Sequence, residues 1–306
     1  MSAAAVVLIL ISAFMHAGWN FFSKRLYPTA EVYMIALTGG AIILLPLILI
    51  HWPALHMFPL RVWMLLLGAG FFQALYFSGL AGAYRHGDLS IAYPVARTLP
   101  VLLVLILSYI LGRGAQISPQ AVAGSVIIVI AAFFLPMRYF GEFRLGNYFN
   151  LTSLFALMAA FGTMGYSVLD DAALQMLRAP EVLGASQSVL EISYLYLALE
   201  AVMSVLWMAL FFLVDVKLLS SDSPDRSKTT PILPSVLMGL MIYVTYGLVL
   251  MSMAYVADVS YVVAFRQVSL PIGVLLGLLI LREPGGWLRF SAVVFMVAGL
   301  ILIATG

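Results

Sequence analysis

Long apolar stretches alternate with short polar connections along almost the whole chain. A helix needs about 20 consecutive, mostly apolar residues to cross the hydrocarbon core of a bilayer. Cutting the sequence at charged, polar and Pro/Gly-rich clusters predicts ten such helices, at 3–22, 31–50, 61–83, 90–111, 118–137, 150–170, 188–214, 232–255, 259–281 and 287–305. The pattern therefore predicts an all-α polytopic membrane protein with ten transmembrane helices.

The composition agrees with this reading. Of the 306 residues, 64% are hydrophobic and 9% are charged, against roughly 25% charged in soluble domains. This excess of apolar side chains must face lipid, which places the protein in a cell membrane, inner or plasma. The net charge of +2 gives no indication of a nucleic-acid partner, and the absence of cysteine excludes disulfides and thiolate metal ligands. The apolar N-terminus lacks a basic region, so we interpret it as the first helix and not as a removable signal.

Short segments recur in the same order in the two halves of the chain. The matched segments are 12–14 and 18–20 with 159–161 and 165–167, and 87–90 with 257–260. Each half contains five predicted spans, and an odd number brings the second copy into the membrane from the opposite side. The sequence therefore predicts two inverted five-helix repeats, 1–146 and 147–306, an architecture common among secondary transporters.

Three short motifs stand out in the sequence: Gly18-Trp19-Asn20 with Lys24, Arg97-Thr98-Leu99-Pro100, and Leu281-Arg282-Glu283-Pro284. They resemble motifs of the drug/metabolite transporter superfamily, in its EamA-type branch of ten-helix proteins. The resemblance implies export or exchange of metabolites such as amino acids. The chain departs from the family pattern at three positions. Arg113 stands where the family has Glu, Arg282 where Gly is usual, and Asp171 matches Lys24 in the repeat.

The basic residues also predict an orientation. Ten Lys and Arg residues fall on one side of the predicted bundle and three on the other. The positive-inside rule then places both termini outside the cytoplasm. The family resemblance implies cytoplasmic termini, and the sequence leaves the two alternatives open.

Charged residues inside the predicted spans are the first candidates for function. A charge at the bilayer centre costs about 2.5–3.5 kcal/mol on insertion scales, so it should face protein or water. Three residues within the predicted spans meet this condition: Arg97, Glu200 and Arg266. Spacing of three or four residues also brings polar and aromatic side chains to one face of a helix, as it does for Tyr166 and Asp170. The predicted substrate-binding residues are His16, Trp19, Asn20, Tyr76, Arg97, Tyr166, Glu200, Tyr246 and Arg266.

These residues have both functional and structural interpretations. The two arginines would neutralise an anionic group of a substrate, or else bond carbonyls and snorkel towards the interface. Glu200 would bind a substrate ammonium or exchange a proton, or else pair with an arginine. Pro94, Pro100 and Pro271 remove helical donors and would form gating segments, or else static bends.

The leading hypothesis is a secondary active transporter, an exporter or exchanger of a small metabolite such as an amino acid or organic anion, with alternating access about a central cavity. An alternative is a carrier of choline-like cations, with an aromatic cage of Trp19, Tyr76, Tyr166, Tyr194 and Tyr246. The sequence has no nucleotide-binding loop, so we expect no use of bound ATP by this chain. A third class is a membrane-embedded enzyme or assembly subunit, but the sequence lacks H-E-x-x-H and G-x-S-x-G. We therefore expect no enzyme, no cofactor and no bound metal. The expected partners are a small solute, the lipid bilayer and, as one option, a proton, with the chain as a monomer or homodimer.

Overall fold

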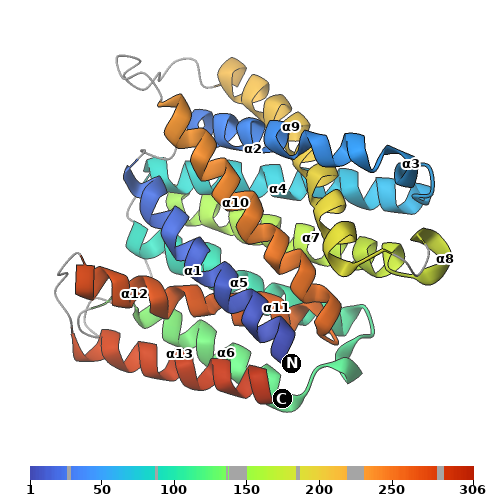
Figure 1. Ribbon diagram of the computed structural model, residues 1–306. Coiled ribbons are helices and arrows are strands. Elements are labelled where there is room, and N and C mark those ends of the chain that lie inside the picture. Colours follow the sequence, from blue (N-terminus) through green and yellow to red (C-terminus); the bar gives the residue numbers. More distant parts are fainter. Residues whose placement is uncertain are drawn as a thin grey trace.

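The computed structural model describes residues 1–25, 29–86, 89–135, 137, 150–183, 187–218, 231–280 and 286–306. All regular structure within these residues is helical (Figure 1). The α-helices are α1 (Ala3–Arg25), α2 (Ala30–Ile50), α3 (Trp52–Leu55), α4 (Leu60–His86), α5 (Leu89–Ile110), α6 (Pro119–Phe134), α7 (Leu151–Leu177), α8 (Pro180–Leu183), α9 (Val189–Leu218), α10 (Ile232–Ser252), α11 (Val259–Phe265), α12 (Ser269–Ile280) and α13 (Trp287–Thr305). Three short 3₁₀ helices join them, η1 (Gly114–Gln116), η4 (Met253–Tyr255) and η5 (Arg266–Val268).

Each of the ten predicted spans overlaps one of these helices or, for 259–281, the run from α11 to α12. Over the described residues, six helices are long and apolar enough to cross a membrane: α2, α4, α7, α9, α10 and α13. The remaining four spans contain shorter apolar helices, at Ala3–Trp19, Ala96–Ile110, Pro119–Phe134 and Val259–Leu275. The polytopic helical class is thus confirmed, and the number of crossings stays a prediction.

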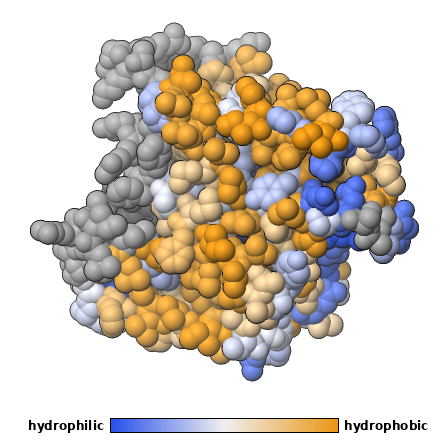
Figure 2. Space-filling view, viewed as in Figure 1, coloured by the Kyte–Doolittle hydropathy of each residue, from blue (hydrophilic) through white to orange (hydrophobic). Residues whose placement is uncertain are grey.

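Large apolar side chains face outwards on the helices at the edge of the bundle. On α13, Phe290 is 70% exposed and Phe295 is 60% exposed. Apolar residues cover most of the face seen in Figure 2, while polar residues gather at the rim where α3 and α8 lie in Figure 1. An exposed apolar surface of this kind is stable when lipid covers it, as expected for a multi-pass membrane protein.

Capping side chains fix where several helices begin. The side chains of Ser118 and Asn150 accept hydrogen bonds from the backbone N–H groups of Ala121 and Ser153, at the starts of α6 and α7. Asp258 does the same for Ser260 at the start of α11. Each cap satisfies a donor that a helix start leaves without an intrahelical partner.

Glycines bring α4 and α7 together at the centre of the bundle. A Cβ added to Gly162 would lie 2.6 Å from the backbone N of Tyr76, and one added to Gly79 would lie 2.7 Å from the backbone N of Ala159. Only glycine permits helices to approach so closely. This contact places Tyr76 of α4 beside the residues of α7 that face the centre of the bundle.

A second glycine pair joins the two peripheral helices α6 and α13. A Cβ on Gly124 would lie 2.5 Å from the carbonyl oxygen of Gly299, and one on Gly299 would lie 2.7 Å from that of Gly124. The two helices therefore pack backbone to backbone at one edge of the bundle (Figure 1).

The two ends of the chain lie at one face of the bundle (Figure 1). The amino group of Met1 donates a hydrogen bond to the carbonyl oxygen of Ala304 at 3.2 Å. At the end of the bundle where α5 and α7 finish, Arg113 forms an ion pair with Asp171, with Nη1 and Oδ2 2.8 Å apart. Gln175 donates to the same carboxylate oxygen at 2.8 Å. Arg113 and Asp171 are two of the departures from the family pattern, so the structure shows that these departures compensate each other in charge.

Replacing Arg113 with glutamine should lower the stability of the folded protein. The Asp171 side chain is 2% exposed, whereas Arg113 is 25% exposed, so the substitution leaves a buried carboxylate without its cation. We expect a loss of about 1–3 kcal/mol, the usual cost of an unsatisfied buried group. Thermal melting of the detergent-solubilised protein measures it. The double variant Arg113→Gln/Asp171→Asn should recover most of the loss, and a double variant no more stable than Arg113→Gln would show that the pair is not coupled.

Candidate functional site

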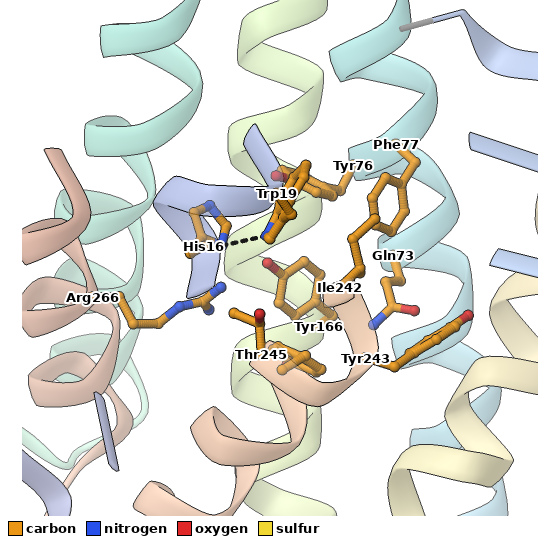
Figure 3. Close-up of a pocket in the computed structure, with 11 residues that line it drawn as sticks. His16, Trp19, Gln73, Tyr76, Phe77, Tyr166, Ile242, Tyr243, Thr245 and Arg266 are labelled. Atoms are coloured by element: carbon orange, nitrogen blue, oxygen red, sulfur yellow. Dashed lines mark hydrogen bonds between the residues drawn. The ribbon is translucent and has the colours of Figure 1, made fainter. Parts of the chain in front are cut away.

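A small cavity lies between helices from both halves of the chain (Figure 3). The helices α1, α4, α7 and α10 and the 3₁₀ turn η5 surround it. Its walls are formed by His16, Trp19, Gln73, Tyr76, Phe77, Tyr166, Ile242, Tyr243, Thr245, Tyr246 and Arg266. The lining is therefore mostly aromatic, with a few polar groups, which is the usual composition of a small-molecule site.

The break between α11 and α12 positions Arg266. Pro271 lacks an N–H and its ring conflicts with the carbonyl of residue 267 in an α-helix, and the chain tightens into η5 just before it. Side chains satisfy carbonyls at the break: Gln267 donates to the oxygen of Val263 at 3.1 Å, and Ser269 to that of Arg266 at 3.0 Å. Arg266 thus lies at a break in the helix, where its side chain turns into the cavity (Figure 3).

The other two predicted gating prolines behave differently. Pro94 and Pro100 both lie within α5, which runs as one helix from Leu89 to Ile110. Pro100 is buried, and the side chain of Pro94 lies outside those that the structure describes. A helix break accompanies Pro271 alone among these three.

The guanidinium of Arg266 is enclosed by tyrosines. It lies 5.5 Å from the ring centroid of Tyr246, in a cation–π arrangement, and contacts the hydroxyl of Tyr166. The rings of Tyr166 and Tyr246 pack edge to face at 5.3 Å, and those of Tyr76 and Tyr166 at 6.0 Å. Within the described part of the chain Arg266 forms no ion pair. A positive charge without a carboxylate partner thus faces the cavity.

His16 connects the cavity wall to Arg97. The indole N–H of Trp19 donates to Nδ1 of His16 at 3.1 Å (Figure 3), and Arg97 Nη1 contacts Nε2 of the same ring. Arg97 Nη2 donates to Ser269 Oγ at 2.6 Å. Arg97 is buried behind His16 and does not line the cavity, so it joins α1, α5 and α12 in a second layer.

Two carboxyl groups form a second layer on the opposite side of the cavity. Glu200 on α9 accepts a hydrogen bond of 2.7 Å from Gln73 Nε2, which lines the cavity. Asp170 on α7 accepts hydrogen bonds from the hydroxyls of Tyr196, at 2.8 Å, and Tyr246. Both carboxyl side chains are fully buried, at 0% exposure. The cavity therefore has a cationic side at Arg266 and Arg97 and an acidic side at Asp170 and Glu200.

The structure brings together most of the residues predicted from the sequence. His16, Trp19, Tyr76, Tyr166, Tyr246 and Arg266 line the cavity, whereas Arg97 and Glu200 lie one contact behind it. The side chain of Asn20 lies outside those described. The predicted substrate-binding residues did not include Gln73, Phe77, Asp170, Ile242, Tyr243 and Thr245. Of these, Asp170 shares a helix face with Tyr166, a spacing visible in the sequence, while the apolar lining residues carry no such signal.

The arrangement of aromatic and polar side chains suits the binding of a small solute. Among the described residues, no group of three or more His, Asp or Glu side chains is placed to hold a metal ion. Arg266 lies on the cavity wall, and Arg97, Asp170 and Glu200 lie one contact behind it. A site of this kind can bind a solute through polar groups and aromatic faces. The fold and this cavity together define a polytopic helical membrane protein with a small cavity lined by aromatic and polar side chains.

Comparison with known proteins shows a family similarity over the first part of the chain. Residues 3–137 match the EamA-like transporter family. This confirms the resemblance seen in the motifs. Over these residues the chain is similar to EamA-like transporters of the drug/metabolite transporter superfamily, and the chain is a multi-pass membrane protein. Proteins of this family are generally transporters of small solutes.

Solved structures share the fold over the full length. One of them, titled "Crystal structure of protein", has a TM-score of 0.69 and 17% sequence identity, and the match covers 100% of this chain and 98% of that one. At this identity the similarity shows a common fold alone. No curated protein matches the chain.

Proposed function

We propose that the protein is a secondary active transporter, an exporter or exchanger of a small metabolite that carries an anionic group, such as an amino acid or an organic anion. The observation that carries this proposal is the aromatic cavity with Arg266 on its wall and no carboxylate paired with it in the described part of the chain. A guanidinium in such a site binds a carboxylate or phosphate strongly, because its planar donors match the geometry of these anions.

The helix pairings support a mechanism in which two inverted halves, 1–146 and 147–306, move against each other. In the proposed inverted repeat, α1 corresponds to α7 and α4 corresponds to α10. A contact of α1 with α10 should then have a counterpart in a contact of α7 with α4. Both contacts occur. In the same way, α2 packs on α10 and α9 packs on α4. The cavity lies between the two proposed halves, where rocking of one half against the other would expose it to each side in turn.

Charge distribution supports a substrate with an anionic end. The cationic wall at Arg266 would hold a carboxylate, and the acidic layer behind Tyr246 and Gln73 would face an ammonium or take part in proton exchange. Glu200 therefore remains our candidate for proton coupling or for binding a substrate ammonium.

The alternative substrate class is a choline-like organic cation. Four of the five residues proposed for an aromatic cage line the cavity: Trp19, Tyr76, Tyr166 and Tyr246. Such faces attract quaternary ammonium groups. The guanidinium of Arg266 on the same wall opposes a cationic ligand, so we favour the anionic class.

Uptake by purified protein in liposomes tests the proposed function. The panel of solutes contains amino acids, organic anions and choline-like cations. For each solute, liposomes are preloaded with the unlabelled compound, and the same compound in labelled form is added outside. We expect counterflow of at least one amino acid or organic anion, chemically unchanged, and no counterflow in liposomes without protein. Counterflow of cations alone would favour the aromatic cage, and chemical conversion of the solute would favour an enzyme. A lack of counterflow for every solute, with protein shown to be folded, would contradict transport of this class.

A further inference from the structure

Asp170 and Glu200 lie against each other in the interior of the membrane protein. Asp170 is on α7 and Glu200 is on α9, and their carboxyl groups are within hydrogen-bonding reach. Both side chains have 0% exposure. In the described part of the chain the one ion pair is that of Arg113 and Asp171, so neither carboxyl group of this pair has a cation bound to it. Two ionised carboxylates in contact without water or a cation are strongly unfavourable.

The hydrogen bonds around the pair show which oxygen needs a proton. Both oxygens of Asp170 accept a tyrosine hydroxyl, Oδ1 from Tyr196 and Oδ2 from Tyr246, as an ionised carboxylate does. Glu200 Oε1 accepts from Gln73, but Glu200 Oε2 is buried without any donor. A buried carboxyl oxygen without a donor is satisfied when it carries a proton and donates it to a neighbouring carboxylate.

The groups around the pair add no cation in direct contact. The titratable and charged side chains that face it from the packed elements are Asp171 on α7, Tyr196 on α9, Tyr243 and Tyr246 on α10 and, beyond the ring of Tyr246, Arg266 in η5. Asp171 is neutralised by Arg113. The tyrosines donate hydrogen bonds and are not counter-ions at neutral pH. A proton is therefore the simplest cation that this site accommodates.

We propose that Asp170 and Glu200 share a single proton and together form the proton-coupling site of the transporter, and this inference rests on the proposed function. The structure corresponds to the form with one proton, held on Glu200 Oε2 and donated to Asp170. A second proton would bind Asp170 and displace one tyrosine donor.

Tyr246 links this site to the substrate site. Its hydroxyl donates to Asp170, while its ring lines the cavity beneath the guanidinium of Arg266. Protonation of Asp170 would release the hydroxyl of Tyr246 and so alter the wall that contacts the solute. Through this one side chain, proton binding and solute binding become interdependent.

Proton-driven accumulation in liposomes tests the pair. The probe is an amino acid or organic anion that gives counterflow with the wild-type protein. Its accumulation is measured with the membrane voltage clamped to zero and with the inside of the liposomes either more acidic or more alkaline than the outside. A transporter that exchanges or carries one proton per solute sustains about tenfold accumulation per pH unit, since the two gradients balance. We expect wild-type protein to accumulate the probe in one polarity. The variants Asp170→Asn and Glu200→Gln should lose this accumulation, because an amide in place of either carboxyl group cannot share the proton.

The controls separate this proposal from the function on which it rests. The variant Arg113→Gln/Asp171→Asn neutralises the neighbouring pair and should still accumulate the probe. Accumulation by either Asp170→Asn or Glu200→Gln, or accumulation driven by a sodium gradient in place of a pH gradient, would overturn the shared proton. Absence of all flux in the wild-type protein would instead contradict the transporter assignment.

An infrared measurement covers the case in which the amide variants fold poorly and lose both modes of flux. The wild-type protein in detergent at neutral pH should show the absorption of a protonated carboxyl group, and Glu200→Gln should lack it. A wild-type spectrum without this band would refute the proposal irrespective of any flux measurement.

Discussion

Replacing Arg266 with glutamine is expected to reduce transport of an amino acid or organic anion by roughly 10- to 150-fold. A hydrogen bond to a charged group contributes about 1.5–3 kcal/mol. Each 1.4 kcal/mol corresponds to about a tenfold change in the rate or affinity. Arg266 is the cation that lines the cavity, within the described part of the chain, and it forms no ion pair there. Glutamine keeps some of the hydrogen-bonding capacity and removes the charge. Uptake by proteoliposomes at a series of solute concentrations measures the loss as a rise in KM, a fall in the maximal rate, or both.

Two further variants control for this result. Arg266→Lys keeps the charge but loses the planar fork, so it should retain more activity than Arg266→Gln. Arg61→Gln removes a charge from an exposed position at the start of α4 and should behave as wild type. If Arg266→Gln transports anions normally, or gains transport of choline-like cations, the anionic substrate class is wrong and the aromatic cage is favoured.

Replacing Gly239 with alanine is expected to prevent α2 and α10 from packing together. A Cβ at this position would lie 1.8 Å from the carbonyl oxygen of Ala36 and 2.5 Å from its carbonyl carbon. These are backbone atoms of α2, so the added methyl group cannot be accommodated by a side-chain rotation. Overpacking typically costs about 1–3 kcal/mol, and we expect at least the upper end of that range here. Size-exclusion profiles and thermal melting of the detergent-solubilised protein measure the effect.

Gly273 offers the matched control in another helix. A Cβ added there would meet no atom within 4 Å. Gly273→Ala should therefore leave stability unchanged or raise it, since alanine favours a helix by about 1 kcal/mol over glycine. Equal stability of Gly239→Ala and Gly273→Ala would mean that the close approach of α2 and α10 does not support the fold.

Hydrophobic length predicted the positions of the helices well, and it could not predict their local breaks. The predicted span 31–50 corresponds to α2, Ala30–Ile50, and the span 287–305 to α13, Trp287–Thr305. Apolar length defines such helices because every backbone polar group in lipid must be bonded within the helix. Proline content alone did not separate continuous α5 from the interrupted run of α11 and α12. That difference depends on side chains such as Gln267, which bond the carbonyls at the break.

The candidate site was predictable where one helix carried the information. Helical spacing brought His16 and Trp19 to one face, and in the structure they line the cavity and bond each other. The pairing of Asp170 with Glu200 joins two helices across 30 positions of sequence, and their relative register follows from packing. Sequence spacing therefore indicated each carboxyl group separately and gave no sign that the two would meet.

The contact between Met1 and Ala304 has a topological consequence. Since residues 1 and 304 meet at one face, we expect the polypeptide between them to cross the bilayer an even number of times. The two fragments of a split fluorescent protein fused to the two ends would thus reassemble within one molecule. An epitope fused to either end, tested for cleavage by an external protease, would then show on which side of the membrane both ends lie. This result would decide between the orientation given by the basic residues and the one implied by the family.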